Sequence, residues 1–190
     1  MHVRAVIFDL DDTLFPQRRI LGELAASLGI GGCPNSLREL HAGLGDQAPP
    51  LAALRRQLLA RLRPDPQRNE RLADLACCIP VAIATNGGPG QREKIRRLGL
   101  AGVIRQVFVS GELGARKPDP AFFAPVLAWA NLPACHCLFV GDDPVCDIAG
   151  AQRAGLRTAW IDSGDRAPPS PAPDLAAATI EDLLPLIEPC

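Results

Sequence analysis

The sequence predicts an α/β fold in which a parallel sheet carries helices on both faces. Two observations support this fold class. Short apolar segments alternate with amphipathic segments along most of the chain, as they do in strand–helix–strand units. The apolar segments are also continuous, which is typical of strands buried on both faces of a sheet. They lie at 3–8, 81–84, 137–140 and 158–161, with a further short strand inside 103–109.

Between the first strand and residue 65 the pattern predicts only helices. Apolar side chains recur there at helical spacing, and glycines or prolines interrupt the pattern. The predicted helices cover 17–29, 37–44 and 51–62. We therefore assign residues 16–65 to a small all-helical cap and residues 1–15 and 66–190 to the core.

The third of these helices is clearly amphipathic, because its leucines fall on one face. Leu54 and Leu58 belong to that face and should pack inward. Arg55 and Arg56 should then lie nearer the outside or the rim. Most of the cap arginines are expected to be solvated, although one or two could reach an anionic ligand.

The remaining helices are predicted at 67–77, 91–98, 120–130, 145–154 and 179–187. The start at residue 120 is the best defined, since Asp119 suits the N-cap position and Pro120 suits the first helical position. Residues 163–174 are rich in proline and predict a surface loop.

Composition limits the classes of function. The 190 residues suit one domain, or one domain with a small insert. A net charge of −1 gives no electrostatic case for binding nucleic acid or an acidic membrane. No apolar run reaches the length of a membrane-spanning helix, and Met1 leads directly into the first strand without a signal-peptide pattern. A cytoplasmic location is therefore the default expectation.

The seven cysteines show no spacing that favours a metal site. Cys135-His136-Cys137 is the one tight cluster of cysteine and histidine, and no second cluster completes four ligands. We expect all seven thiols to be reduced, as they are in a cytosolic protein.

The segment Asp9-Leu10-Asp11-Asp12-Thr13 directly follows the first predicted strand. Carboxylates two residues apart project from the same side of an extended backbone. Bringing two negative charges together is costly unless a cation lies between them. Oxygen ligands of this kind are those that Mg²⁺ prefers, and Mg²⁺ often binds phosphate as well. The motif alone fits a metal site that handles phosphate and fits a helix-capping turn about equally well.

Three later segments place further polar side chains in a fixed order. They are Thr85-Asn86-Gly87-Gly88, Lys117-Pro118-Asp119-Pro120 and Gly141-Asp142-Asp143-Pro144-Val145-Cys146-Asp147. Ligands of open parallel sheets bind at the carboxyl ends of the strands, so these segments should converge on one crevice. Together with the first segment they resemble the motifs of the haloacid dehalogenase-like (HAD) hydrolase superfamily, most members of which are phosphatases. The resemblance covers residues 3–161 and implies a Rossmann-like core with the small cap inserted after the first motif.

The chemistry and the resemblance together suggest a role for each acid. Asp9 would be the nucleophile that forms an aspartyl-phosphate. Asp11 would protonate the leaving oxygen and then accept a proton from the hydrolytic water. Mg²⁺ would be held by Asp9, by the backbone carbonyl of Asp11, and by Asp142.

Other residues would bind the phosphate or support the site. Lys117 would neutralise charge on the transferred group. The Thr85 hydroxyl and the backbone N–H groups of Asn86 and Gly87 would bind phosphate oxygens. By the resemblance, Asp147 would hold Lys117 or a metal-bound water.

Three positions depart from the usual pattern of the superfamily. Asp12 occupies a position where relatives often have Gly or Asn. Asp143 lies where Ser or His is common, and Cys146 lies where Asn is common. These departures leave the roles of Asp12 and Asp143 open, and we place Asp143 with Asp147 among the residues around the metal ligands.

The predicted function is a Mg²⁺-dependent phosphatase that acts on a small phosphomonoester, such as a sugar phosphate or a nucleoside monophosphate. A 2-haloacid dehalogenase is the first alternative, but that reaction needs neither a metal nor an acid at the position of Asp11. A phosphomutase would need a larger cap, and a non-catalytic binding module would not need all four motifs. The sequence leaves both a monomer and a homodimer open.

Overall fold

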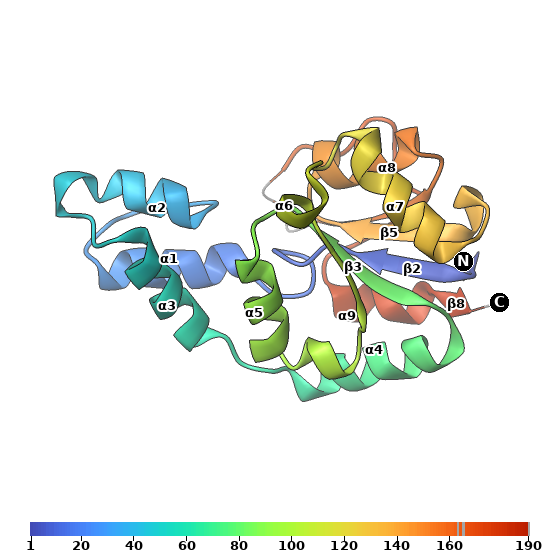
Figure 1. The fold of residues 1–190 in the computed structure, drawn as a ribbon, viewed down its shortest axis with the longest axis horizontal. Coiled ribbons are helices and arrows are strands. Elements are labelled where there is room, and N and C mark those ends of the chain that lie inside the picture. Colours follow the sequence, from blue (N-terminus) through green and yellow to red (C-terminus); the bar gives the residue numbers. More distant parts are fainter. Residues whose placement is uncertain (163, 165, 190) are drawn as a thin grey trace.

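A six-stranded parallel sheet forms the centre of the protein in this computed structural model, which describes residues 1–162, 164 and 166–189. In spatial order its strands are β4 (Gln106–Val109), β3 (Val81–Thr85), β2 (Ala5–Phe8), β5 (Cys137–Gly141), β6 (Arg157–Ile161) and β7 (Leu175–Ala177). The first strand of this sheet along the chain, β2, lies between β3 and β5 (Figure 1). The residue that follows β2 therefore has neighbours from both halves of the sheet.

Helices cover both faces of the sheet, as predicted (Figure 1). One face packs against α4 (Pro66–Cys78), α5 (Gly90–Arg97) and α9 (Ile180–Leu183), and the other against α7 (Pro120–Ala130) and α8 (Gly150–Arg153). Alternate residues of β2 supply the two cores: Val6 and Phe8 belong to the first, and Ala5 and Ile7 to the second. Burial on both sides explains why the strands are continuously apolar.

Three of the helices between β2 and β3 lie beyond the carboxyl ends of the strands (Figure 1). They are α1 (Gln17–Ser27), α2 (Leu37–Gly43) and α3 (Leu51–Arg61). Leu54 and Leu58 of α3 are fully buried, whereas Arg55 and Arg56 are exposed. The inward and outward faces of α3 are thus those that the leucine spacing predicts.

Several short elements differ from the predictions. The first apolar run is divided, because β1 (His2–Val3) pairs with β8 (Glu188–Pro189) in a separate two-stranded sheet. The helix predicted at 145–154 begins as a π-helical turn, η4 (Pro144–Ala149), before α8. The helix predicted at 179–187 ends early and continues as a 3₁₀ turn. Short elements that had no sequence signal are α6 (Ser110–Leu113), β7, and the 3₁₀ turns Gly45–Gln47, Leu100–Gly102, Ala134–His136 and Leu184–Leu186.

Two predictions concern residues only partly covered by the structure. The proline-rich loop predicted at 163–174 is described except for residues 163 and 165, and the described part has no helix or strand. Cysteines are free at 33, 77, 78, 135, 137 and 146, while Cys190 lies outside the described residues. Among the helices that are described, none has the length and apolar character needed to cross a membrane.

Candidate active site

The acidic motif and two later motifs meet at the carboxyl ends of three adjacent strands. Asp9 follows β2, Thr85 ends β3, and Asp142 follows β5. Phe8 pairs in register with Ile83 on one side and with Val140 on the other. The Asp9 amide donates to the Val140 carbonyl at 2.8 Å, which fixes the backbone of Asp9 against β5. The parallel register therefore places these side chains around one crevice.

Lys117 comes from the loop before α7 and is almost fully buried beside Asp9. Its Nζ lies 2.6 Å from Asp9 Oδ1 and 2.7 Å from Asp147 Oδ1. It also donates to the Ala84 carbonyl at 2.9 Å. Burial opposes its charge, but the carboxylates of Asp147 and Asp9 outweigh that effect and raise the pKa of Lys117. Lys117 is therefore a permanent positive charge between two acids.

Three buried carboxyl groups form a cluster around this point. Asp9, Asp142 and Asp147 each place a carboxylate oxygen within 4.8 Å of the other two. Burial raises the pKa of Asp9 well above its ordinary value; Lys117 lowers it, while the neighbouring acids raise it further. Burial and the charge of Asp147 raise the pKa of Asp142 to about 7.

The cluster fits a hard divalent cation. All of its donors are carboxylate oxygens, and a cation among them would offset the repulsion between their negative charges. The predicted ligands Asp9 and Asp142 are both present, and Asp147 joins them with its side chain. Sequence reasoning placed Asp147 beside the ligands and did not anticipate how close its oxygens lie to theirs.

Two arginines that sequence reasoning did not select neutralise Asp142. Arg18 Nη2 lies 3.0 Å and Arg166 Nη2 3.3 Å from Asp142 Oδ2. Arg166 also pairs with Asp143 at 2.9 Å. Arg18 lies at the start of α1 and Arg166 in the proline-rich loop, and arginines in such segments carry no sequence signal that separates them from solvated ones.

Asp11 points away from this cluster, toward α5. Lys94 Nζ lies 2.8 Å from each of its carboxylate oxygens, and Gln91 Nε2 donates to one of them at 3.0 Å. Lys94 also contacts the Gln17 side chain at the start of α1. Sequence reasoning missed Lys94 and Gln91, because α5 is so rich in charge that it resembles a solvated helix. Their spacing of three residues, which puts both on one face of the helix, was the available signal.

The Thr85 motif is tied to its surroundings by its side chains. Thr85 is buried, and its Oγ1 accepts from Gln91 Nε2 at 2.8 Å. The side chain of Asn86 makes two hydrogen bonds with the backbone of Lys117. Its Oδ1 accepts from the Lys117 amide at 2.9 Å, and its Nδ2 donates to the Lys117 carbonyl at 3.0 Å. The Gly87 amide donates to Ser110 Oγ at 2.9 Å, so this N–H could bind phosphate only by giving up that bond.

Asp143 and Asp12, whose roles the sequence leaves open, both accept hydrogen bonds from backbone amides. Asp143 Oδ1 accepts from the amides of Val145 and Cys146 and so caps η4. Burial alone would raise the pKa of Asp143, but these amides and Arg166 lower it. Asp12 has φ of +64°, a left-handed conformation that Gly and Asn adopt more readily. Its carboxylate accepts from the Arg18 amide at 2.8 Å, which stabilises the turn into α1.

Two cavities open on these residues. The central cavity, of about 220 Å³, is lined by Asp9, Asp142, Asp147, Lys117 and Thr85 among others. The side cavity, of about 180 Å³, lies between α3 and α5 and is lined by residues such as Arg55, Leu58 and Lys94. Both cavities share Asp11, Gln17 and Asn86 in their walls. The acid at position 11 thus lies where the two spaces adjoin.

The parallel sheet with helices on both faces is the fold that the resemblance to the HAD superfamily implies, and comparison with known proteins agrees. Residues 114–184 match the family model described as HAD-hydrolase-like. The phosphoserine phosphatase of Thermus thermophilus is 38% identical over 107 residues, which are 55% of this chain and 43% of that enzyme. The chain thus spans less than half the length of this curated relative.

Solved structures resemble the whole chain. The HAD-hydrolase YfnB of Bacillus subtilis, bound to magnesium, superimposes with a TM-score of 0.73 at 23% identity, over 98% of this chain and 99% of that one. The 2-haloacid dehalogenase of Pseudomonas syringae pv. Tomato gives a TM-score of 0.66 at 28% identity, over 97% of both chains. The family model, the curated relatives and the solved structures together support a HAD superfamily hydrolase.

Proposed function

We propose that the protein is a Mg²⁺-dependent phosphatase that hydrolyses a small phosphomonoester through an aspartyl-phosphate. The observation that carries this proposal is the difference in position between two acids, Asp9 and Asp11. Asp9 lies in a buried cluster beside Lys117, while Asp11 points into the wall between the two cavities. A nucleophile and a separate proton donor are what two-step phosphate transfer requires.

In the first step, a carboxylate oxygen of Asp9 attacks phosphorus and forms the acyl-phosphate bond. The bond from phosphorus to the leaving oxygen breaks, and its electron pair stays on that oxygen. Asp11 gives its proton to the same oxygen, so the product leaves as an alcohol and not as an alkoxide. Lys117, 2.6 Å from Asp9, offsets negative charge on the transferred group.

In the second step, water attacks the phosphorus of the aspartyl-phosphate. Asp11, now ionised, accepts a proton from this water, and the bond from phosphorus to the Asp9 oxygen breaks. Inorganic phosphate leaves and both acids return to their starting protonation states. The Thr85 hydroxyl and the Asn86 amide would bind phosphate oxygens during both steps.

Mg²⁺ would be held by Asp9, Asp142 and Asp147, with the Asp11 carbonyl as a further ligand. It would screen the repulsion between the Asp9 carboxylate and the phosphate. Asp143 and Arg166 would keep the loop that carries Asp142 in place, since they are paired to each other and Asp143 caps η4.

A 2-haloacid dehalogenase is the main alternative, because several of the similar structures are such enzymes. The acidic cluster argues against it, since displacement of halide needs a nucleophile but no metal. The contacts of Asp11 with Lys94 and Gln91 hold its carboxyl group in the wall between the two cavities, where a dehalogenase would need no acid. The same acids argue against a non-catalytic binding module. A phosphomutase would need a cap that returns the phosphoryl group to the substrate, and the cap of residues 16–65 is small.

Residues 16–65 would act as a cap over the site. Gln17 and Arg18, at the start of α1, reach Lys94 and Asp142 of the core. Side chains of α3 line the side cavity. A cap built in this way can distinguish substrates by their leaving groups, because the core motifs contact only phosphate and metal.

The decisive experiment is a panel of phosphomonoesters assayed with and without Mg²⁺. We expect turnover with Mg²⁺, loss of turnover in excess chelator, and recovery when Mg²⁺ is restored. Ca²⁺ should substitute poorly, because its larger and more flexible coordination misplaces the attacking carboxylate. Full activity in chelator, or faster reaction of 2-chloropropionate than of every ester, would refute the proposed function.

A further inference from the structure

The position of Asp11 decides where the leaving group must go. Asp11 is in the wall shared by the central and side cavities. If the phosphoryl group is bonded to Asp9 in the central cavity, the oxygen that Asp11 protonates lies near that shared wall. The carbon skeleton attached to this oxygen therefore extends into the side cavity, and the lining of that cavity selects the substrate.

The side cavity carries a net positive charge. Its charged lining residues among those the structure describes are Asp11, Lys94 and Arg55. Lys94 and Asp11 form an ion pair and compensate each other. Arg55 has neither an ion pair nor a hydrogen bond from its side chain within the described part of the chain. One uncompensated guanidinium thus remains at the cavity.

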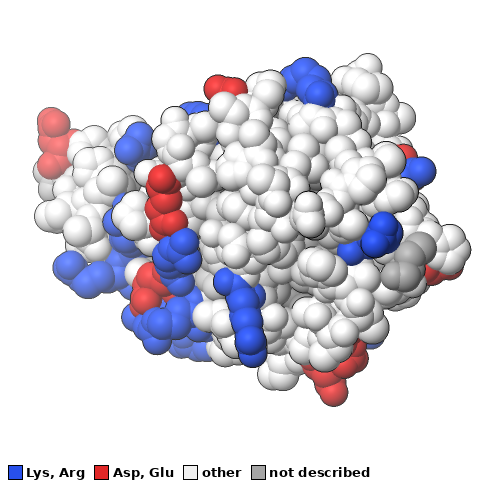
Figure 2. Space-filling model, turned by 45° about the vertical axis from the view of Figure 1, so that its right-hand side comes forward, with Lys and Arg blue, Asp and Glu red and all other residues white. Residues whose placement is uncertain are grey.

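The position of Arg55 beside the start of α5 adds to the positive electrostatic potential of the side cavity. Its Nε and Cζ atoms lie 3.7 Å from where a Cβ of Gly90 would be. Gly90 begins α5, so the guanidinium rests against the positive end of a helix. A guanidinium beside the amide end of a helix favours an anion bound between or beside them. Figure 2 shows basic side chains gathered on the side of the molecule where the cap helices and α5 lie.

We propose that the side cavity binds a leaving alcohol that carries a second anionic group, a carboxylate or a phosphate, and that Arg55 pairs with this group. The inference rests on the proposed phosphatase function and specifies its substrate class. Leu58 and Leu59 give the cavity an apolar wall along which a short carbon chain can lie.

The size of the cavity limits the length of that chain. Its volume of about 180 Å³ is below the roughly 300–1,000 Å³ of sites for drug-sized ligands. An alcohol of a few carbon atoms fits such a space, whereas a nucleoside does not. The substrate class is therefore a short phosphorylated acid or a short bisphosphate.

The test compares esters that differ only in this charge. 3-Phosphoglycerate and glycerol 1-phosphate have the same carbon number, and a carboxylate in the first replaces a hydroxymethyl group in the second. Glycerol 1,3-bisphosphate gives the corresponding comparison for a phosphate, because it differs from glycerol 1-phosphate only in the second phosphate group. We expect the wild-type protein to prefer both anionic esters, by about tenfold in kcat/KM, as one partly exposed charged hydrogen bond would give.

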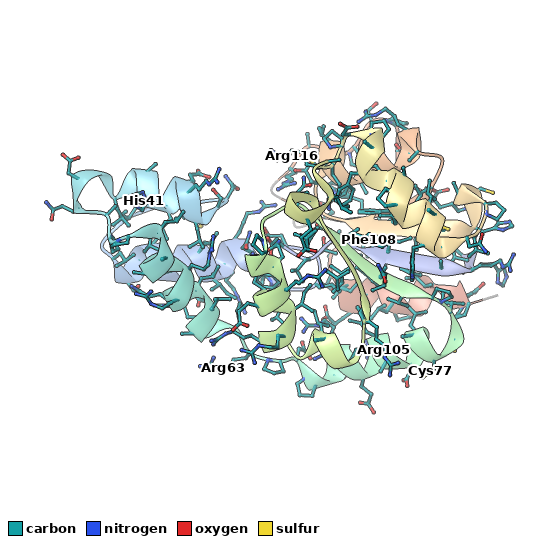
Figure 3. The ribbon with its side chains drawn as sticks, viewed as in Figure 1. His41, Arg63, Cys77, Arg105, Phe108 and Arg116 are labelled. Atoms are coloured by element: carbon teal, nitrogen blue, oxygen red, sulfur yellow. The ribbon has the colours of Figure 1, made fainter. Side chains whose placement is uncertain are left out.

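Arg55→Ala should bring the ratio of kcat/KM between the anionic esters and glycerol 1-phosphate close to one, chiefly by raising KM for the anionic esters. Arg55→Lys should retain part of the preference. Arg56→Ala is the matched control, because Arg56 is the neighbouring exposed arginine of α3 and does not line the cavity. Arg116→Ala tests whether an arginine of the central cavity causes the preference instead. Arg116 lines that cavity from the loop before α7 (Figure 3). Its loss should weaken all three esters alike.

The outcomes separate this inference from the function on which it rests. Turnover of all three esters without preference, or a preference that survives in Arg55→Ala, would overturn the inference and leave the phosphatase intact. Calorimetric binding to Asp9→Asn measures the preference independently of turnover. Selective binding of the anionic esters supports the inference even if no ester is hydrolysed, a result that would overturn only the proposed function.

Discussion

Lys94 contacts both carboxylate oxygens of Asp11 at 2.8 Å, and this ion pair links the N-terminal acidic motif to a helix more than eighty residues away. The contact fixes the side chain of Asp11 in the wall between the two cavities. Gln17 contacts the same ammonium group from the first cap helix. Lys94 is therefore a positioning residue for the proposed acid, and its position depends on the cap as well as on the core.

Replacing Lys94 with Met should reduce kcat by about tenfold, less than removal of the acid itself, whose contribution is typically 10²–10⁴-fold. The side chain keeps its bulk but no longer orients Asp11. The reduction should be larger for alkyl phosphates than for p-nitrophenyl phosphate, because a good leaving group needs less protonation. Steady-state kinetics on both esters measures this difference. An equal loss on both would indicate a purely structural role for Lys94.

Asp11→Asn should lower turnover of alkyl phosphates by roughly 10²-fold or more, since the amide can neither donate nor accept the required proton. Asp9→Asn should abolish turnover of every ester, because it removes the nucleophile. Thermal unfolding provides the control, as both variants should remain folded. Full turnover of alkyl phosphates by Asp11→Asn would show that Asp11 is not the proton donor.

Lys117→Met should destabilise the metal-free protein by about 3 kcal/mol, the usual scale for leaving a buried charge unpaired. Asp9 and Asp147 would lose the cation that lies 2.6 Å and 2.7 Å from them. The loss should be smaller near pH 5, where Asp9 can take up a proton. Urea unfolding at two pH values tests this, and Arg116→Met, an exposed neighbour, should change stability by less than about 0.5 kcal/mol.

Stabilisation by Mg²⁺ should be greater at about pH 8 than at about pH 5.5. The pKa of Asp142 is raised from 3.8 to about 7, and that of Asp9 is raised too. At pH values between the unfolded-state and folded-state pKa of these acids, the folded state binds protons that the unfolded state releases. The free energy of unfolding of the metal-free protein therefore falls as pH rises. Mg²⁺ must displace those protons at low pH but not at high pH.

The measurement is the rise in Tm on adding Mg²⁺ at each pH. Asp142→Asn should lose most of the rise at about pH 8, because it removes a metal ligand. Ca²⁺ serves as a comparison of cation size. A rise in Tm that does not depend on pH would contradict the role of these acids in binding the metal.

The core of the fold could be predicted because its strands are buried on both faces. Continuous apolar runs gave the positions of β2, β3, β5 and β6, and Asp119 with Pro120 gave the start of α7 at the correct residue. The strands that were missed have no such pattern. β7 and β8 have three and two residues, so their pairing depends on contacts formed only after the rest of the sheet is in place.

The site could be anticipated where a polar residue directly follows an apolar strand, as Asp9, Thr85 and Asp142 do. Lys117 could be predicted only from the resemblance to a known family, because no periodicity in the sequence indicates that a loop lysine forms a buried ion pair. Lys94 and Arg18 lie on helices next to other charged residues, and only tertiary packing selects them from their neighbours. Arg55 was considered together with Arg56, and the structure separates the two by the cavity that Arg55 lines.

The central position of β2 has a consequence for the order in which the site forms during synthesis. Residues 5–8 leave the ribosome well before their partners in β3 and β5, which follow only at 81–83 and 137–140. Closing such long loops has an entropic cost that the strand contacts repay only when they form. Asp9 is therefore translated before every other residue of the acidic cluster, yet it becomes fixed only when most of the chain has been made.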